Sequence, residues 1–375
     1  MTHLELNSKI KWILIYLLLG ACVAKVDFDV PLAQSQIVIE GIISDSPGPY
    51  TVYVSKALSL NSDSSYRDAI EKVKIKLMDD LGNSENLIEV NSGVYKTGGV
   101  IQGEVGHSYH IILETLDGKK FESEPDMLKA VGALTDIRFT YEARRSKTAF
   151  TEIDADVFNI YIDGDSPAGD DNYTRWRFKG TYKIVTFPDL NYTKTPPYAP
   201  YKNPYPCSGF RIGEGPIGSG GILIRFGECT CCTCWANQFE EMPQLSDIQL
   251  ASNNQFKNIK VAEVRITNNF FADKYLVEVE QMSLSRMAFD YFKLIRKQKE
   301  GASSIFQPPA GKIVGNIKAL NSNVSVVGLF WATSIKSKYI FINRSNVPYP
   351  LTPPEYSTMP CNRVKYSSNV KPILW

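Results

Sequence analysis

Apolar and polar side chains alternate with a period of two through most of the chain from about residue 36. In the clearest run, Val73, Ile75 and Leu77 alternate with lysines. This period places the apolar side chains on one face of a strand and the polar ones on the other. Asp117 and Gly118 separate two such runs and are typical of a two-residue hairpin turn, in which both positions favour positive φ. The pattern predicts a chain built mainly from short strands.

One segment has a helical period instead. Its apolar positions recur at intervals of three and four residues, as on the buried face of an amphipathic helix. They are Met287, Tyr291, Leu294 and Ile295. Ser283 or Ser285 can cap the start of this helix, and Gly301 can end it after a basic last turn. We predict a helix over residues 284–299.

The predicted strands fall into two groups, separated near Pro125. Residues 33–126 hold at least five short strands, which is typical of a small β-sandwich. Residues 134–375 hold the other strands, the helix and a cysteine-rich segment. The predicted fold class is mainly β: an N-terminal immunoglobulin-like β-sandwich followed by a larger β-rich domain with one amphipathic helix.

The composition excludes some classes of partner. The 41 basic side chains nearly balance the 40 acidic ones, so the chain lacks the positive charge of a nucleic-acid-binding protein. There are three histidines in all. His107 and His110 are three positions apart on a predicted strand, so they point to opposite faces and cannot share a metal ion. No catalytic residues, metal site or cofactor are predicted, and we do not expect an enzyme.

The first residues are typical of a bacterial lipoprotein leader. Lys9 and Lys11 precede a short apolar run that is too short to cross a bilayer stably. The run ends in the small residues Gly20 and Ala21, followed by Cys22, whose thiol would receive the lipid. We predict a signal peptide over residues 1–21, cleaved before the lipidated cysteine. The alternatives are an ordinary signal peptide with an incidental cysteine, or a membrane helix.

Residues 22–32 then form a lipidated tether, which holds the protein to a membrane. Asp27 and Asp29 follow the cysteine closely. In lipoproteins of Bacteroidota, a short acidic stretch at this place resembles the signal for transfer to the outer face of the outer membrane. A plain polar tether is the alternative.

Six further cysteines remain after Cys22 is acylated. They are Cys207, Cys229, Cys231, Cys232, Cys234 and Cys361. An even number in an exported chain favours disulfides. Because the neighbours Cys231 and Cys232 can bond each other only with strain, we expect partners from Cys207 and Cys361 and one short bridge inside the cluster. The alternative is a thiolate site for Cu(I) or Zn(II).

A loop over residues 187–206 combines six prolines with four tyrosines, which are Tyr192, Tyr198, Tyr201 and Tyr205. Proline stiffens the loop and so lowers the entropy cost of presenting these rings to a partner. They are the predicted partner-binding residues. Trp176, Trp235 and Trp331 could also stack on a ligand, but rings within strands are more often core. Asp163 and Asp165 could bind calcium, although a solvated loop is the more common outcome.

Several short motifs give the chain a resemblance to a known family. Its order of motifs is similar to that of Bacteroidota outer-membrane lipoproteins grouped as domain of unknown function 4249. The motifs are Val38-Ile-Glu40-Gly41, Gly106-His-Ser-Tyr109, Asn172-Tyr173-Thr-Arg175-Trp176, Tyr275-Leu-Val-Glu-Val-Glu-Gln281, Phe306-Gln-Pro-Pro309, Gly315-Asn316-Ile317 and Gly328-Leu-Phe-Trp-Ala-Thr-Ser334.

The resemblance implies a location and a setting more than an activity. Members of this family tend to be encoded beside TonB-dependent outer-membrane transporters. We therefore expect a surface-exposed outer-membrane lipoprotein that faces the cell exterior and serves as a ligand-binding or accessory subunit of a TonB-dependent barrel protein. The alternatives are an envelope hydrolase acting on glycan or peptide, and a structural subunit of an outer-membrane assembly complex.

The anchor gives the first test. Replacing Cys22 with Ser should abolish lipidation and leave uncleaved or mislocalised protein, because the acylated thiol is what the lipoprotein signal peptidase recognises. Metabolic labelling with palmitate measures this directly, with the wild-type chain as the positive control. Label that persists in the mutant would show that the lipid is attached elsewhere.

Overall fold

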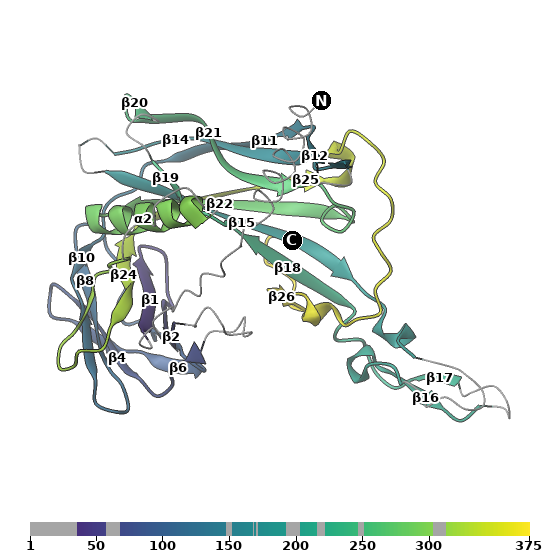
Figure 1. Ribbon diagram of the computed structural model, residues 1–375, viewed down its shortest axis with the longest axis horizontal. Coiled ribbons are helices and arrows are strands. Elements are labelled where there is room, and N and C mark those ends of the chain that lie inside the picture. Colours follow the sequence, from purple (N-terminus) through teal and green to yellow (C-terminus); the bar gives the residue numbers. More distant parts are fainter. Residues whose placement is uncertain are drawn as a thin grey trace, which may run out of the picture.

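The computed structural model describes residues 36–57, 68–147, 152–167, 169, 172–192, 203–215, 222–246, 251–302 and 313–375. Within them the chain is mainly β with one α-helix, which confirms the predicted fold class at this level. The predicted leader and tether, with Cys22, lie outside the described residues. Figure 1 shows two bodies of strands that meet beside the helix, and a narrow arm that extends away from them. No described helix is long and apolar enough to span a membrane.

The N-terminal body contains two six-stranded sheets. The strands of the first are β1 Ile37–Ser44, β2 Thr51–Lys56, β3 Asp68–Ala69, β6 Ile88–Asn91, β7 Val94–Lys96 and β24 Val326–Thr333. They lie in the order β24-β1-β2-β7-β6, with β3 also paired to β2. The strands of the second are β4 Lys74–Asp79, β5 Ser84–Asn86, β8 Ser108–Glu114, β9 Lys120–Ser123, β10 Asp126–Met127 and β23 Ile317–Ala319. They lie in the order β23-β9-β8-β4-β5, with β10 paired to β8.

The two sheets share one apolar core, which the alternating pattern produces. Ile39 on β1, Ile75 and Leu77 on β4, and Ile111 on β8 are all at most 2% exposed and belong to the same cluster. The lysines between them face solvent. Val73 is also buried, so the predicted inward face of this run is confirmed. The immunoglobulin-like topology stays a prediction, since one pair in these sheets is parallel.

The predicted domain boundaries need a correction. Two strands of the N-terminal body, β23 and β24, come from residues 317–333, far beyond the predicted boundary at 126. β24 pairs in parallel with β1 along the whole length of β1. The prediction over 33–126 missed them because local periodicity identifies a strand but not its distant partner. The predicted second domain, 134–375, is therefore interrupted.

The C-terminal body also contains two sheets. The strands of one are β11 Leu134–Glu142, β14 Val157–Asp165, β20 Ala251–Ser252 and β21 Gln255–Arg265, in the order β11-β14-β21-β20. The strands of the other are β15 Tyr173–Val185, β18 Thr233–Phe239, β19 Gln244–Leu245, β22 Lys274–Leu284, β25 Ile335–Asn343 and β26 Ser367–Ser368. They lie in the order β25-β22-β15-β18-β26, with β19 paired to β15. Phe158, Trp176 and Val277 belong to the core cluster of this body.

Gln281 satisfies the polar groups at the centre of this body. Its side chain is fully buried. The indole Nε1 of Trp176 donates to its Oε1 at 3.0 Å, and its Nε2 donates to the backbone oxygens of Gly132 and Asp165 at 3.1 and 2.9 Å. Because a buried polar group without a partner costs free energy, this one amide ties β22 to β15 and to the ends of the neighbouring sheet.

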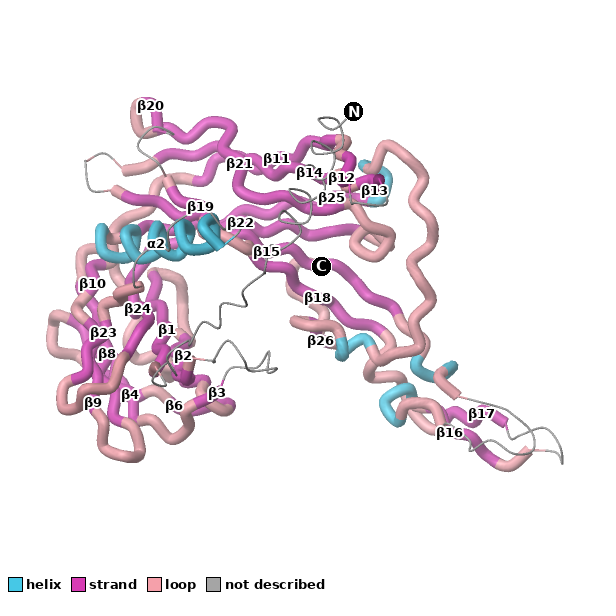
Figure 2. Tube along the Cα trace, in the orientation of Figure 1, coloured by secondary structure: helices cyan, strands magenta, loops and turns pink. Residues whose placement is uncertain are grey.

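The single helix of the described chain, α2, spans Arg286–Ala302, close to the predicted 284–299. Ser285 caps it, since the Ser285 Oγ accepts a hydrogen bond from the Ala288 amide at 3.1 Å. Its most buried residues are Ala288 and Phe292, not Leu294. They pack into a third apolar cluster with residues of β22 and β24. Figure 2 shows the helix lying where the two bodies meet.

Shorter elements complete the chain. A hairpin of β16 Phe210–Gly213 and β17 Ile222–Arg225 forms the arm, and a second hairpin pairs β12 Arg145–Lys147 with β13 Glu152–Asp154. The 3-10 helices are η1 Pro188–Leu190, η2 Pro206–Ser208, η4 Arg344–Asn346 and η5 Cys361–Arg363. In Figure 1 the arm projects away from both bodies.

A fragment experiment tests the corrected boundary. The isolated fragment 33–126 should fail to fold cooperatively, because without β23 and β24 it leaves Ile39 and Ile43 beside an open sheet edge. A fusion of 33–126 to 313–334 through a flexible linker should restore a single unfolding transition, followed by circular dichroism during heating. A sharp transition for 33–126 alone would mean that the N-terminal body does not need the distant strands.

Candidate functional site

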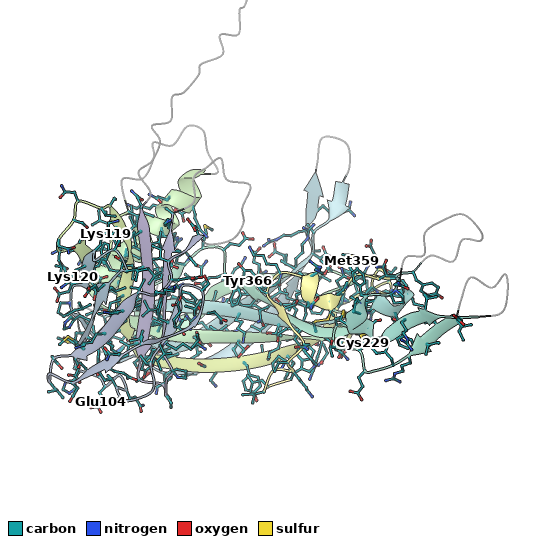
Figure 3. The ribbon with its side chains drawn as sticks, turned by 90° about the horizontal axis from the view of Figure 1, so that it is seen from below. Glu104, Lys119, Lys120, Cys229, Met359 and Tyr366 are labelled. Atoms are coloured by element: carbon teal, nitrogen blue, oxygen red, sulfur yellow. A yellow bond between two sulfur atoms is a disulfide. The ribbon has the colours of Figure 1, made fainter. Side chains whose placement is uncertain are left out.

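The six cysteines form three disulfides. Cys207 bonds Cys231, Cys229 bonds Cys232, and Cys234 bonds Cys361. This arrangement agrees with the expected short bridge inside the cluster and with partners from Cys207 and Cys361. Figure 3 places Cys229 where the arm leaves the body. The first two bridges therefore hold the base of the β16–β17 hairpin, while the third fixes the C-terminal segment to β18.

The third bridge is the most buried. Cys234 and Cys361 are both fully buried, and the Cys361 amide donates to the Cys231 oxygen at 3.0 Å. Neighbouring β26 pairs with β18 at Trp235 and Ala236. This disulfide and the short ladder are joined by further hydrogen bonds, such as the one from the Phe187 amide to the Ser357 oxygen at 2.8 Å, in attaching the segment after residue 344 to the C-terminal body.

Two of the four predicted contact tyrosines can be placed. Tyr192 and Tyr205 are half-buried, and the Tyr205 hydroxyl lies 3.1 Å from the Met359 sulfur. Tyr198 and Tyr201 lie outside the described residues. Tyr205 precedes η2 at the root of the arm, so part of the predicted contact loop packs against the C-terminal segment and is less exposed than we expected.

The other candidates have structural roles. Trp176 is core, as expected for a ring within a strand. Asp163 forms an ion pair with Arg138, and the Asp165 carboxylate accepts a hydrogen bond from the Ala133 amide at 2.7 Å. Both carboxylates therefore have partners within the protein. His107 lies 2.9 Å from Asp80. Within the described ranges no three His, Cys, Asp or Glu side chains gather closely enough to hold a metal ion.

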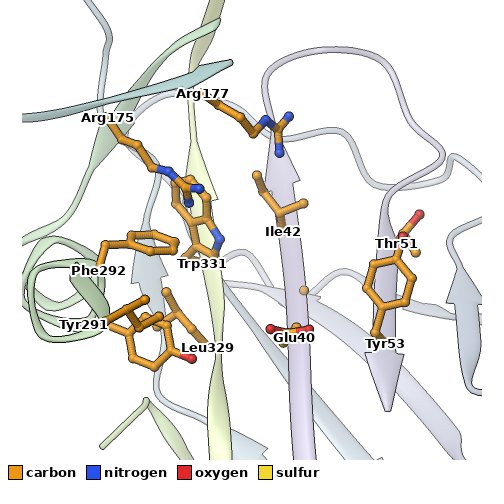
Figure 4. Close-up of a pocket in the computed structure, with 12 residues that line it drawn as sticks. Glu40, Ile42, Thr51, Tyr53, Arg175, Arg177, Tyr291, Phe292, Leu329 and Trp331 are labelled. Atoms are coloured by element: carbon orange, nitrogen blue, oxygen red, sulfur yellow. The ribbon is translucent and has the colours of Figure 1, made fainter. Parts of the chain in front are cut away.

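A pocket lies where the two bodies meet. This junction pocket has a volume of about 370 Å³ and is lined by residues of β1, β2, β15, β24 and α2. Figure 4 shows the two arginines at one end and Glu40 toward the other, with aromatic rings between them on the side of α2 and β24. Its principal residues are Glu40, Ile42, Arg175, Arg177, Phe292 and Trp331.

The two arginines are each held by a carboxylate from the C-terminal body. Arg175 forms an ion pair with Glu240, and both side chains are nearly buried, at 13% and 12% exposed. Arg177 pairs with Glu280 on the adjacent strand. The Arg175 guanidinium also lies 4.1 Å from the centre of the Phe292 ring, within the range of a cation–π contact. These contacts hold both guanidinium groups beside the pocket.

The aromatic wall comes from α2 and β24. Phe292 and Trp331 meet edge to face, with ring centres 5.2 Å apart. Burial, and secondarily the negative charge of Glu40, raises the pKa of Tyr291 to about 12. Its hydroxyl is therefore protonated at neutral pH and can donate a hydrogen bond. The wall is apolar apart from the Tyr291 hydroxyl and the indole NH of Trp331.

Motifs that lie far apart in the sequence meet at this pocket. Glu40 belongs to the first motif of the family resemblance, Arg175 to the third, and Trp331 to the last. Sequence reasoning missed the site because it judged each motif alone. Their shared signal is a charged residue or large ring within an otherwise regular strand. They come together only because β24 pairs with β1 while the next strand, β25, pairs with β22 beside β15.

The disulfides make a comparison of stability possible. In the chain-entropy description, the bridge that closes 127 residues is worth about 5 kcal/mol, and the one that closes 3 residues about 2 kcal/mol. The double mutant Cys234→Ala/Cys361→Ala should therefore unfold at a lower denaturant concentration than the control Cys229→Ala/Cys232→Ala.

The wild-type protein in denaturant should show no free thiol. About six free thiols, or one equivalent of bound zinc or copper, would support the metal alternative instead.

Comparison with known proteins agrees with the motifs. A protein family described as a domain of unknown function (DUF4249) matches residues 23–339. A comparison with curated proteins finds no match. The matched residues include every side chain named above for the junction pocket. Because this match covers most of the chain, the chain belongs to the DUF4249 family.

Proposed function

We propose that this protein is a surface lipoprotein of the outer membrane that binds a ligand without transforming it, as an accessory subunit of a TonB-dependent transporter. The observation that carries the proposal is the junction pocket, in which residues of three separate family motifs line one cavity. A family whose motifs meet in a pocket is best explained by a shared ligand. The membrane anchor is inferred from the lipoprotein leader. The transporter is inferred from the genes beside which members of the family tend to be encoded.

The chemistry of the pocket favours binding over catalysis. Arg175 and Arg177 are committed to Glu240 and Glu280 as ion pairs. General acid–base catalysis needs a group that gains and loses a proton near the operating pH. Arginine does not do this, and Tyr291 holds its proton well above neutral pH. Glu40 is the one carboxylate among the described lining residues, whereas glycoside hydrolysis commonly uses a pair of carboxylates. The described residues that line the junction pocket are therefore suited to hold and orient a ligand.

The disulfides support an exported location. Three bridges within one chain are typical of proteins that fold in an oxidising compartment. Two of them stiffen the root of the arm, and an isolated two-stranded hairpin is only marginally stable in water. A stapled arm can meet a partner at a lower entropy cost than a free loop. We therefore assign the arm and the adjoining tyrosine loop to contact with the transporter.

Affinity purification of the tagged lipoprotein from gently solubilised membranes tests the proposal. The wild type should recover a TonB-dependent barrel protein, identified by mass spectrometry. Replacing Tyr192, Tyr198, Tyr201 and Tyr205 with Ser should reduce that recovery several-fold, because truncation of anchoring aromatic rings removes much of the binding energy at an interface.

The matched control replaces Tyr339, an exposed tyrosine away from both the arm and the junction pocket, with Ser. It should recover the barrel as the wild type does. Equal recovery with the quadruple mutant would remove the loop from the interface. Recovery of no barrel by the wild type would overturn the accessory role and favour the hydrolase or assembly alternatives.

A further inference from the structure

The C-terminal segment over residues 361–375 is basic. It contains Arg363, Lys365 and Lys371, which are all exposed, and no acidic residue. Within the described residues none of these three side chains forms an ion pair. Lys365 lies 4.8 Å from the centre of the Tyr366 ring, a cation–π contact that leaves its charge without a counter-ion. The segment therefore carries three positive charges that no described carboxylate pairs with.

Two further lysines come from the sheet on which this segment lies. β26 pairs with β18 at Trp235, and the centre of the Trp375 ring lies 6.5 Å from that of Trp235 and 6.1 Å from that of Phe341. The Lys274 Nζ lies 5.1 Å from the centre of the Trp375 ring. Lys183 is the cross-strand partner of Trp235, and such partners share one face of a sheet. The five cations thus lie at one end of the C-terminal body, where the chain end meets β18 (Figure 1).

The same segment exposes apolar side chains. Ile373 is fully exposed, Val370 is 72% exposed, and Val364, Tyr366 and Leu374 are each at least 38% exposed. Exposed apolar side chains that lie together mark a site of interaction. They project from a segment in which β26 has only two residues. A protein partner would need a shape complementary to each of them, whereas the fluid boundary of a bilayer accepts projecting side chains. Residues 361–375, with Lys183 and Lys274, are the C-terminal surface.

The C-terminal surface is held in place by covalent and hydrogen bonds. The buried disulfide between Cys234 and Cys361 fixes its start to β18. The Ser367 Oγ lies 2.9 Å from the Cys361 oxygen and 2.7 Å from the Val364 oxygen, at hydrogen-bond distance from both. A segment that is already ordered loses little conformational entropy when it meets a partner.

The predicted lipid anchor holds this surface close to a bilayer. Residues 22–36 span at most about 50 Å when fully extended, which lets the C-terminal body reach the membrane. Each Lys or Arg near an anionic bilayer strengthens binding about five-fold. The whole chain, with 41 basic and 40 acidic side chains, is nearly neutral, so any attraction to an anionic surface is local.

We propose that the C-terminal surface docks on the anionic lipid of the membrane that anchors the protein. Its five cations contact the lipid phosphates, and Tyr366, Val370 and Ile373 enter the headgroup layer. The assignment rests on the membrane location in the proposed function and adds a second contact with that membrane. It requires no bond to form or break.

Sedimentation with lipid vesicles tests the assignment. The chain over residues 22–375 carries Cys22→Ser, so that no acyl chain contributes to binding. One kind of vesicle is phosphatidylcholine alone, and the other contains a quarter of anionic phosphatidylglycerol. The protein should bind the anionic vesicles about 10-fold more tightly or better, because several cations lie near the lipid. High salt should remove most of this difference, since it screens the charges.

A charge variant identifies the cations that bind the lipid. The triple variant is Arg363→Gln/Lys365→Gln/Lys371→Gln. It should bind the anionic vesicles on the order of 100-fold more weakly, at about five-fold for each cation, and its binding should depend less on salt. The matched control removes the same charge from exposed lysines elsewhere, in Lys74→Gln/Lys76→Gln/Lys297→Gln. It should bind as the wild type does. Circular dichroism confirms that each variant is folded.

An apolar variant separates insertion from attraction between charges. Val370→Ser/Ile373→Ser removes two exposed aliphatic side chains and keeps every charge. It should bind the anionic vesicles several-fold more weakly, because less apolar area leaves water. The dependence of its binding on salt should match that of the wild type.

Three outcomes would overturn the assignment: no binding to the anionic vesicles, equal binding to both kinds of vesicle at low salt, or equal losses in the triple variant and its control. Each is distinguishable from failure of the proposed function. If the barrel protein is recovered but vesicles are not bound, the C-terminal surface does not dock on lipid and the accessory role stands. If vesicles are bound but no barrel is recovered, the lipid assignment stands and the accessory role falls.

Discussion

A nearly continuous strand joins the two bodies, and the rest of the arrangement depends on it. β24 pairs in parallel with β1 in the N-terminal body, and β25 pairs with β22 in the C-terminal body. Only Ser334 separates them. The Ser334 amide donates to the Ser283 Oγ at 2.8 Å, and the Ile335 amide donates to the Asp45 carboxylate at 2.9 Å. Because both ladders are fixed, the two bodies are held at one relative position.

The close approach of β1 and β24 requires glycine on both strands. A Cβ at Gly328, whose φ is +128°, would lie 1.8 Å from the Ile39 oxygen, and a Cβ at Gly41 would lie 2.8 Å from the Phe330 ring. Neither space admits a side chain. The glycines let Phe330 fill the core on one face while Leu329 and Trp331 face the pocket and α2 on the other. The same backbone contact thus builds the core and one wall of the site.

Features of the fold whose sequence signal lies within a few neighbouring residues could be predicted, and features that depend on distant residues could not. The alternation at Val73, Ile75 and Leu77 needs only neighbours in sequence, and so does the serine that caps α2. The formation of disulfides, with one short bridge inside the cluster, was also predictable, because the number and spacing of the cysteines limit their partners. The position of β24 was not, because strand pairing across some 290 residues leaves no local mark. The junction pocket was missed for the same reason, since its walls come from β1, β15, β24 and α2.

The pocket is also preorganised by the contacts that join the bodies. Glu240 and Glu280 hold the arginines, and Phe292 is packed between Arg175 and Trp331. A ligand that enters such a site does not have to order the side chains that bind it, so less of its contact energy is lost to entropy. The buried ion pair of Arg175 has a cost in desolvation. A fold that keeps such a pair beside an open cavity gives up some stability to hold a guanidinium group in a fixed place.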